Sequence, residues 1–327
     1  MSSEQIDALK ALLPDAVAAR VQSLRLKDGR ATLVIEASGL SALDRDKLEI
    51  AAKATLRGAE GVSEVRVAMM AEKVQRRIIA VGSGKGGVGK STVSANIAVA
   101  LARLGRKVGL VDADIYGPSQ ARLLATEGLR PIAREKQLVP VDSPWGLQML
   151  SMAQLADPGQ AIAWRGPMAG NALSQLIEAD WGDAEILVVD LPPGTGDIQL
   201  TMLQKFKPAG AVIVSTPQDL ALMDAMRAIE LFEKSNVPLI GMVENMSGYA
   251  CPHCGEISDP FGAGGAQAAA KSAGMPFLGR IPLELAIRQE SDAGRPPAAG
   301  DGAEAKPFLA IADAIAAWLD AKVERSA

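Results

Sequence analysis

Hydrophobic and polar positions follow two different spacings along the first 70 residues. Apolar residues three and four positions apart predict helices over residues 6–13 and 44–57. Alternation of apolar and polar residues predicts strands over residues 21–26, 31–36 and 61–67, with a turn at residues 27–30. The predicted order, αββαβ, indicates a small α+β domain over residues 1–70 of a size that could fold alone.

From residue 77 onward, short β-branched strands alternate with longer helical segments. The predicted strands are residues 78–81, 108–111, 147–150, 186–189, 211–214, 239–243 and 277–281. Apolar strands that alternate with helices are typical of a mostly parallel sheet with helices on both faces. We therefore predict an α/β domain over residues 77–327, joined to the first domain by a short charged linker at residues 71–76.

An apolar helical stripe lies near the C-terminus and consists of Phe308, Ile311, Ile315, Trp318 and Leu319. A stripe of this kind packs onto a sheet or anchors a protein to a membrane surface. The opposite face of the helix mixes acidic and basic residues and is not rich in Lys and Arg. The pattern therefore favours packing onto the sheet.

Composition argues against several classes of function. The chain has 327 residues, a net charge of −4 and no long basic run, which argues against nonspecific binding of nucleic acid. No apolar run approaches about 18 residues, so we expect no membrane span. The N-terminus lacks the basic and apolar regions of a signal peptide. Two cysteines in the whole chain are typical of a reducing, cytoplasmic setting.

The most informative motif lies between the predicted strand at residues 78–81 and a predicted helix at residues 91–104. Residues 84–91 match the phosphate-loop pattern GxxxxGK[ST]. In such a loop, backbone N–H groups surround phosphate oxygens, the lysine reaches the β- and γ-phosphates, and the hydroxyl takes a Mg²⁺ position. The candidate ATP-binding residues are Gly84, Lys85, Gly86, Gly87, Val88, Gly89, Lys90, Ser91 and Thr92.

Carboxylates at two further strand ends complete a predicted hydrolase site. Asp112 and Asp114 follow one strand, and Asp190 follows another, before a glycine-ended loop that contains Gly194. Strand-end aspartates also cap helices, but behind a phosphate loop they favour phosphoryl chemistry. We expect Ser91 and Asp190 to hold Mg²⁺, and Asp114, with Asp112 as the weaker candidate, to position the attacking water.

Lys85 is an additional lysine, directly after the first glycine of the loop. Because Lys90 already serves the phosphates of its own chain, a second lysine here could point away and reach the nucleotide of a neighbouring subunit, as an arginine finger does. The alternative is a solvated lysine without a catalytic role, which is the usual state of this residue type.

The only cysteines are Cys251 and Cys254. A metal ion or iron–sulfur cluster usually needs four ligands, so two subunits related by a twofold axis would complete a Cys₄ site. A dithiol redox role would require the pair at a helix N-terminus in a thioredoxin-like setting, and a plain surface loop is the third interpretation. The first interpretation predicts a homodimer, as the trans role of Lys85 also does.

Together these residues resemble the Mrp/ApbC branch of P-loop ATPases over about residues 76–300. The similar segments are residues 83–92 (a deviant Walker A motif), 112–119, 164–168, 190–197, 244–247 and 251–254. The resemblance implies a cytoplasmic, homodimeric ATPase that holds a [4Fe-4S] cluster between its subunits and transfers it to apoproteins. It also implies that Lys85 contacts the partner's nucleotide and that Asn245 reads the adenine. With the assignments made above from the residues, the predicted catalytic set is Lys85, Lys90, Asp114 and Asp112.

The first 70 residues resemble the small domain that often precedes this ATPase in bacteria and is related to iron–sulfur assembly proteins. That domain usually has Asp-Pro before its first strand, whereas this chain has Pro14-Asp15 in the region and no cysteine there. We therefore expect this domain to dock a partner and not to hold a cluster. The partners implied by the resemblance are apo iron–sulfur proteins and a cluster-assembly scaffold.

Two other classes of ATPase share parts of this pattern. Targeting or chaperone ATPases join a deviant Walker A motif to a zinc-binding CxxC at a dimer interface, but they need a Met-rich helical insert, and none is visible in the sequence. Spatial regulators of the septum-positioning or plasmid-partition type predict a basic amphipathic tail or a basic DNA-binding surface, and neither is evident. The sequence therefore favours a cluster carrier.

Overall fold

The chain forms two compact units. The structure is a computed structural model that describes residues 3–38, 40, 42–70, 75–134, 137–155, 167–251 and 253–324. The first unit comprises Met1–Gln75 and Asp180–Asp183, and the second comprises Arg76–Ala179 and Ala184–Ala327. Of the expected linker, residues 71–74 lie outside the described residues.

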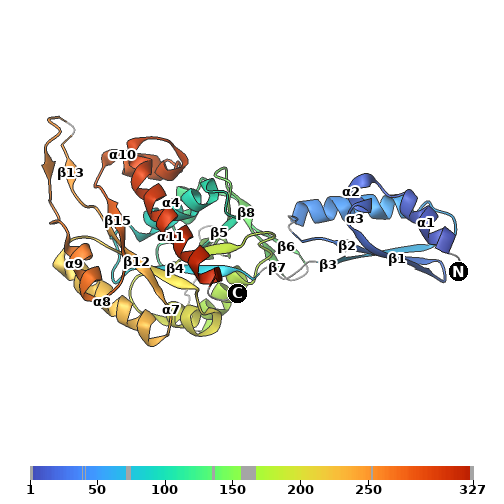
Figure 1. Ribbon diagram of the computed structural model, residues 1–327, viewed down its shortest axis with the longest axis horizontal. Helices are drawn as coiled ribbons and strands as arrows, with labels where there is room; N and C mark the ends of the chain where they lie inside the picture. The colour runs from blue at the N-terminus through green and yellow to red at the C-terminus, as the bar shows by residue number, and fades with distance from the viewer. Residues whose placement is uncertain are drawn as a thin grey trace. The chain divides into compact units, whose positions relative to one another are not determined.

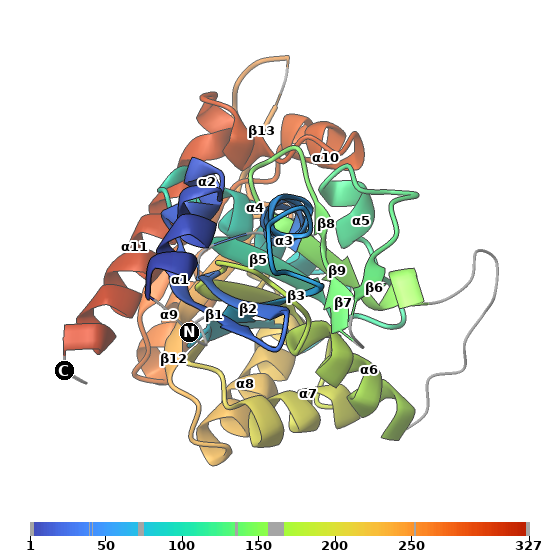
Figure 2. The ribbon, with the colours of Figure 1, turned by 90° about the vertical axis from the view of Figure 1, so that its right-hand side faces the viewer.

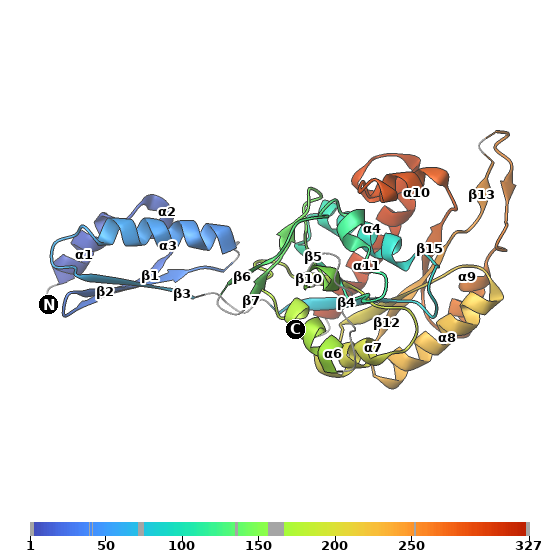
Figure 3. The same ribbon diagram turned by 180° about the vertical axis from the view of Figure 1, so that it is seen from behind.

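The first unit is a three-stranded sheet with helices on one face, as Figures 1 and 3 show from opposite sides. Its elements are α1 (Ser3–Ala11), α2 (Asp15–Ala18), β1 (Val21–Lys27), β2 (Arg30–Glu36), α3 (Ala42–Leu56) and β3 (Glu64–Met70). β1 pairs antiparallel with β2, and β2 pairs parallel with β3. The predicted turn between β1 and β2 is confirmed, with positive φ at Asp28 and Gly29.

Two predicted elements in this unit have wrong bounds, and α2 was not predicted: the helix expected at residues 6–13 is Ser3–Ala11, and the strand expected at residues 61–67 is Glu64–Met70. The helix expected at residues 6–13 ends at Ala11, because Pro14 disfavours helical backbone directly before it and Leu13 N–H donates to the Lys10 carbonyl in a turn. The strand expected at residues 61–67 begins only at Glu64, because Gly61 has φ +79° and belongs to the preceding turn.

The second unit is built on an eight-stranded sheet in the order β15-β12-β11-β4-β10-β5-β9-β8. Its strands are β4 (Arg77–Gly82), β5 (Val108–Asp112), β8 (Val141–Asp142), β9 (Gln148–Ser151), β10 (Ile186–Asp190), β11 (Gly210–Ser215), β12 (Leu239–Asn245) and β15 (Phe277–Ile281). All neighbours pair in parallel except β8, which pairs antiparallel with β9 at one edge. The predicted mostly parallel sheet is confirmed.

Helices cover both faces of this sheet. Figures 1 and 2 show α4, α10 and α11 on one face and α7 and α8 on the other. The α-helices are α4 (Lys90–Arg103), α5 (Gln120–Leu123), α6 (Pro167–Ile177), α7 (Asp197–Thr201), α8 (Asp219–Lys234), α9 (Gly265–Ser272), α10 (Leu285–Asp292) and α11 (Lys306–Glu324). A π-helical turn, η2 (Met202–Phe206), and three 3₁₀ turns, η1 (Met152–Leu155), η3 (Pro297–Ala299) and η4 (Ala303–Ala305), join some of these elements.

Two small hairpins lie outside the main sheet. One pairs β6 (Ile132–Arg134) with β7 (Gln137–Val139), and the other pairs β13 (Tyr249–Ala250) with β14 (Ile257–Ser258). The β13–β14 hairpin projects away from the body of the unit (Figure 1).

The apolar stripe near the C-terminus lies in the core. Phe308, Ile311 and Ile315 of α11 are 0% exposed and pack with α4 residues such as Ile97 in one hydrophobic cluster. The stripe therefore packs onto the domain, as predicted. Among the described residues, every helix is too short or too polar to cross a bilayer.

The strand register brings the predicted chemistry to one edge of the sheet. β10 lies between β4 and β5, although the chain passes through β5 first, so the connection from β4 crosses over β10. Asp190 at the end of β10 pairs in register with Val81 on one side and with Asp112 on the other. In open parallel sheets, ligands bind beyond the carboxyl ends of the strands, at the point where the strand order reverses.

Candidate nucleotide-binding site and cysteine hairpin

The glycine-rich loop connects the end of β4 to the first residue of α4. Gly87 and Gly89 have φ +82° and +80°, a left-handed backbone that favours glycine. Within the described part of the chain, the backbone N–H groups of Gly86, Gly87 and Gly89 donate to no other residue. These residues line a cavity of about 350 Å³, so unpaired donors face a space at a helix N-terminus, which fits an anion such as phosphate.

Gly84 and Gly89 are also needed because the chain approaches itself closely. A Cβ on Gly84 would lie 2.0 Å from the backbone carbon of Asp224 in α8, so the loop packs directly on that helix. A Cβ on Gly89 would lie 2.1 Å from the Asn245 side-chain nitrogen at the end of β12. Asn245 Nδ2 in turn donates to the Val88 carbonyl at 2.8 Å, so the loop is held from both α8 and β12.

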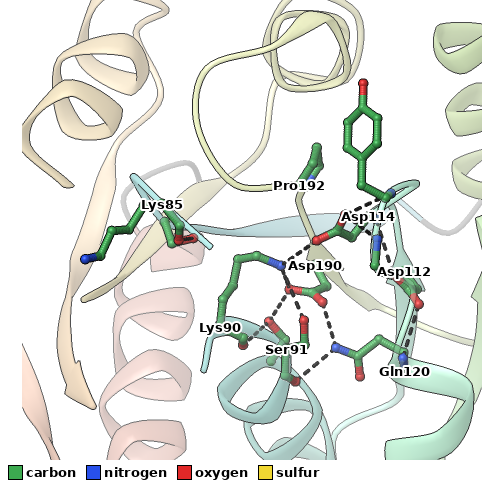
Figure 4. A network of polar contacts seen from close by, with 12 residues as sticks. Lys85, Lys90, Ser91, Asp112, Asp114, Gln120, Asp190 and Pro192 are labelled. Carbon is green, nitrogen blue, oxygen red and sulfur yellow. Dashed lines mark hydrogen bonds and ion pairs between the residues drawn. The ribbon is translucent and has the colours of Figure 1, made fainter. Parts of the chain in front are cut away.

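Lys90 lies at the centre of a buried polar cluster, shown in Figure 4. Its Nζ is 2.5 Å from Asp190 Oδ1 and 3.8 Å from Asp114 Oδ2. The Lys90 side chain is 6% exposed and the Asp190 side chain 0%. Ser94 Oγ donates to the same Asp190 oxygen at 2.9 Å. The ion pair thus joins the phosphate loop to the end of β10 away from bulk water.

The two carboxylates after β5 have different surroundings. Asp112 is 0% exposed and accepts from Ser151 Oγ at 3.0 Å and from the Asp114 backbone N–H at 3.2 Å. Burial, and then the negative charge of Asp190, raises the pKa of Asp112 to about 7, although its hydrogen bonds act in the opposite direction. Asp114 lines the cavity, and its Oδ1 accepts from the Tyr116 and Gly117 backbone N–H groups.

Gln120, at the start of α5, links these carboxylates and was not predicted. Its Nε2 donates to Asp190 Oδ2 at 2.8 Å and to the Ser91 carbonyl at 2.9 Å, and its backbone N–H donates to Asp112 Oδ2 at 3.1 Å. The side chain is 0% exposed. Ser94 and Ser151 were also missed. A sequence signal existed only for Ser94, which lies one helical turn after Lys90 and therefore on the same face of α4.

The two loop lysines point in different directions. Figure 4 shows Lys90 directed toward Asp190, whereas the Lys85 side chain extends away from the cluster of Lys90, Asp190 and Asp114. Lys85 also lines the cavity and is half-buried. In the part of the chain that the structure describes, its ammonium forms no salt bridge.

The other predicted nucleotide residues surround the same space or lie directly behind it. Ser91 and Thr92 line the cavity, whereas Val88 is 2% exposed and packs in the core. Gly194, after β10, has φ +88°, and its N–H donates to the Ser83 carbonyl at 3.0 Å, so the loop after β10 is tied to the phosphate loop. Of the segment at residues 164–168, residues 164–166 lie outside the described residues.

The cysteines lie at the tip of the β13–β14 hairpin. Cys251 is half-buried, Cys254 is exposed, and both are free. The Cys251 N–H donates to the Glu256 carbonyl at 2.9 Å, and the Gly255 N–H donates back to the Cys251 carbonyl at 2.8 Å. Hydrogen bonds from the Cys254 backbone, the His253 backbone and the Cys254 thiol lower the pKa of Cys251. Such bonds favour the thiolate, the form that binds metal.

The fold and this cavity define a P-loop nucleotide-binding protein. A family model described as ParA, NUBPL iron-transfer P-loop NTPase, matches residues 74–316. The chain belongs to this family of P-loop NTPases.

Curated relatives of the chain carry names from iron–sulfur chemistry. An iron–sulfur cluster carrier protein of Pseudomonas fragi is 50% identical over 229 residues, covering 69% of this chain and 79% of the relative. A cluster carrier protein of Deinococcus radiodurans is 42% identical over 291 residues, covering 85% and 82%. The iron–sulfur cluster transfer protein NUBPL of Dictyostelium discoideum is 46% identical over 247 residues, covering 75% and 76%.

Solved structures support the fold. A nucleotide-binding protein of Archaeoglobus fulgidus in complex with ADP has a TM-score of 0.62 and 37% identity, covering 71% of this chain and 91% of that one. The septum site-determining protein MinD of Pyrococcus horikoshii has a TM-score of 0.56 at 22% identity, covering 73% and 96%. At that identity the second similarity concerns the fold alone.

The contacts of Gly89 predict a loss of nucleotide binding in Gly89→Ala. The new Cβ would displace the Asn245 amide and is strained at φ +80°, so we expect nucleotide affinity to fall by at least about tenfold. Gly105→Ala is the matched control, because Gly105 also has φ +80° but nothing within 4 Å. The control should lose about 1–2 kcal/mol of stability and keep its affinity. Titration calorimetry and thermal denaturation measure both, and equal affinities in the two variants would contradict the prediction.

The raised pKa of Asp112 predicts that this residue destabilises the folded state increasingly as pH rises. Between the unfolded value near 3.8 and the folded value of about 7, the folded state binds more protons than the unfolded state, so stability falls as pH rises. Asp112→Asn removes this term. Its free energy of unfolding should therefore gain on wild type between pH 5 and 7, by at most about 1.4 kcal/mol per pH unit. Urea denaturation at the two pH values measures the gain, and a constant difference would refute it.

Proposed function

We propose that this chain is an ATP-binding and ATP-hydrolysing iron–sulfur cluster carrier that acts as a homodimer. In this proposal a [4Fe-4S] cluster bridges Cys251 and Cys254 of two copies and is passed to apoproteins. The observation that carries the proposal is the presence, in one domain, of a phosphate-binding cavity and a projecting hairpin that presents two free cysteines. The names of the relatives fit the cysteine hairpin, and the P-loop NTPase family fits the cavity.

At the nucleotide, each described group has a role that its surroundings support. The unpaired N–H groups of the loop would donate hydrogen bonds to phosphate oxygens, and Lys90 would neutralise the phosphate charge. Mg²⁺, when bound, would offset the charge of the phosphates. Ser91 lines the cavity and would hold the ion directly, whereas the more deeply buried Asp190 would hold it through water. Asp114 would position the attacking water, because Asp112 is buried and lies further from the cavity.

The cysteine hairpin supports a site shared between two chains. No group of three or more His, Cys, Asp and Glu side chains among the described residues is arranged to hold a metal ion. Two thiols are half of the set that a cluster usually needs, and a second hairpin would supply the rest. Their exposed position also suits a cargo that must reach an acceptor protein. Two unbridged cysteines fit a reducing compartment such as the cytoplasm.

An apolar stripe on α8 supports dimer formation beside the nucleotide. Leu220, Met223 and Met226 recur every three residues and are 71%, 58% and 37% exposed. Because Gly84 packs on the α8 backbone at Asp224, this stripe lies close to the phosphate loop and Lys85. A second copy seated here would cover the stripe and bring each Lys85 toward the partner's nucleotide.

The cysteine pair provides the first test of the proposal. After anaerobic reconstitution with iron and sulfide, wild type should show the broad visible absorbance of a cluster and elute as a dimer. Cys251→Ser/Cys254→Ser should lose nearly all bound iron, because no other cysteine exists in the chain. His253→Ala is the matched control within the same hairpin and should keep the iron. Metal analysis and size-exclusion chromatography measure both properties. Equal iron in the cysteine variant, or uptake of zinc alone by wild type, would reject the carrier function.

Lys85 provides a second test, which separates action in cis from action in trans. Lys85→Ala should bind ATP normally but hydrolyse it at least about tenfold more slowly, because groups that neutralise the transferring phosphoryl are worth that much or more. Lys90→Ala should not bind ATP, because it loses the lysine of the phosphate loop. If Lys85 acts across the dimer, mixing the two impaired variants raises turnover above that of Lys85→Ala alone, because mixed dimers contain one complete site.

The α8 stripe supplies the control for the mixing experiment. Leu220→Glu/Met223→Glu, added to both impaired variants, should prevent dimer formation and therefore abolish the gain in turnover. Thermal denaturation shows whether each variant is folded. Failure of the original pair to regain activity, when differently tagged copies of the two variants co-purify as mixed dimers, would exclude a trans role for Lys85.

A further inference from the structure

The sheet of the first unit has one face that none of the unit's own helices covers (Figure 3). The strand register identifies the residues that share this open face. Lys27 pairs with Arg30, and Arg30 pairs with Glu64 in one row across the three strands. Arg25, Thr32 and Arg66 form the next row. Further along, Ser23, Val34 and Ala68 form a third row of small, uncharged side chains.

The first two rows concentrate positive charge on this open face. Arg25, Lys27, Arg30 and Arg66 are exposed, and Glu64 is the one acidic residue in these two rows. Glu64 already forms ion pairs with two of these cations, since Arg30 Nε lies 2.6 Å and Arg66 Nε 2.9 Å from its carboxylate. Those hydrogen bonds lower the pKa of Glu64 and keep it charged. Arg25 and Lys27 form no salt bridge with any described residue.

This arrangement is not one that stability alone would favour. Lys27 and Arg30 are direct cross-strand partners, and like charges in that position are destabilising. Charges on edge strands do protect a sheet from pairing with other chains. That explanation covers β1 and β3, but not Arg30, which lies on the central strand β2. The chain as a whole is acidic, with a net charge of −4, so this face differs in sign from the average surface.

The chemistry of the face selects the class of partner. Single-stranded nucleic acid is usually held by aromatic side chains that stack on the bases, and residues 1–75 contain no Phe, Tyr, Trp or His. The side chains of the third row are short and uncharged. An extended polypeptide can therefore lie against the sheet beside the basic rows. We propose that this sheet face docks an acidic segment of a partner protein, whose carboxylates pair with Arg25 and Lys27.

The proposal does not depend on the cluster-carrier function, because the test needs neither nucleotide nor cluster. The probe is a fluorescein-labelled peptide of ten glutamates, and its binding to the full-length chain is measured by fluorescence anisotropy at low and at moderate salt. Wild type should bind the peptide, with affinity that falls as salt rises. Arg25→Glu/Lys27→Glu should bind at least about tenfold more weakly, since opposed charges become like charges.

The matched control reverses two other exposed cations of the same unit. Lys10→Glu/Arg57→Glu changes the net charge by the same amount but lies on or beside the helices, away from the open face. It should bind the peptide as wild type does, and thermal denaturation should show both variants folded. Equal weakening in the two variants would overturn the proposal, because binding would then follow net charge. Tighter binding of single-stranded DNA or of anionic lipid vesicles than of the peptide would overturn it as well.

Discussion

The buried ion pair between Lys90 and Asp190 is the interaction on which the nucleotide site depends. Burying one charge without its partner costs several kcal/mol, so neither side chain is free to change alone. The pair joins the phosphate loop to β10, and Gln120 extends the connection to α5 and to Asp112 after β5. Lys90 therefore lies beside two carboxylates, those of Asp190 and Asp114. Burial, with the nearby charge of Asp190 as the second cause, raises the pKa of Asp112.

The nucleotide site and the cysteine hairpin of the second unit are built in opposite ways. The nucleotide end is rigidly determined: glycines touch neighbouring backbone and side chains, and the charged groups are buried and hydrogen-bonded. The cysteine end is a short hairpin held by few contacts, with one thiol exposed and the other half-buried. A fixed cavity suits a ligand that is always the same, whereas an accessible tip suits a group that passes between proteins.

Sequence patterns predicted those parts of the structure that depend on local or periodic signals. The seven parallel strands and the helix after the loop were found, because short apolar runs and a spaced motif mark them. Gln120, Ser151 and the short α2 could not be found in this way. Gln120 matters because tertiary contacts place its amide between Asp190 and the Ser91 carbonyl, and nothing in its neighbours along the chain indicates this. The cross-strand rows of the first unit likewise required the register, since the sequence alone shows only scattered cations.

Asn245 belongs to two functional regions at once. Its side chain holds the phosphate loop at Val88, and its backbone ends β12 immediately before the segment that leads into the hairpin. Ser247 continues that connection, since its hydroxyl donates to Glu244, whose carboxylate also receives N–H groups from the start of α9. A substitution at Asn245 therefore changes the support of both regions. Kinetic data on such a variant do not separate nucleotide recognition from the placement of the thiols, and only variants further along the hairpin can do so.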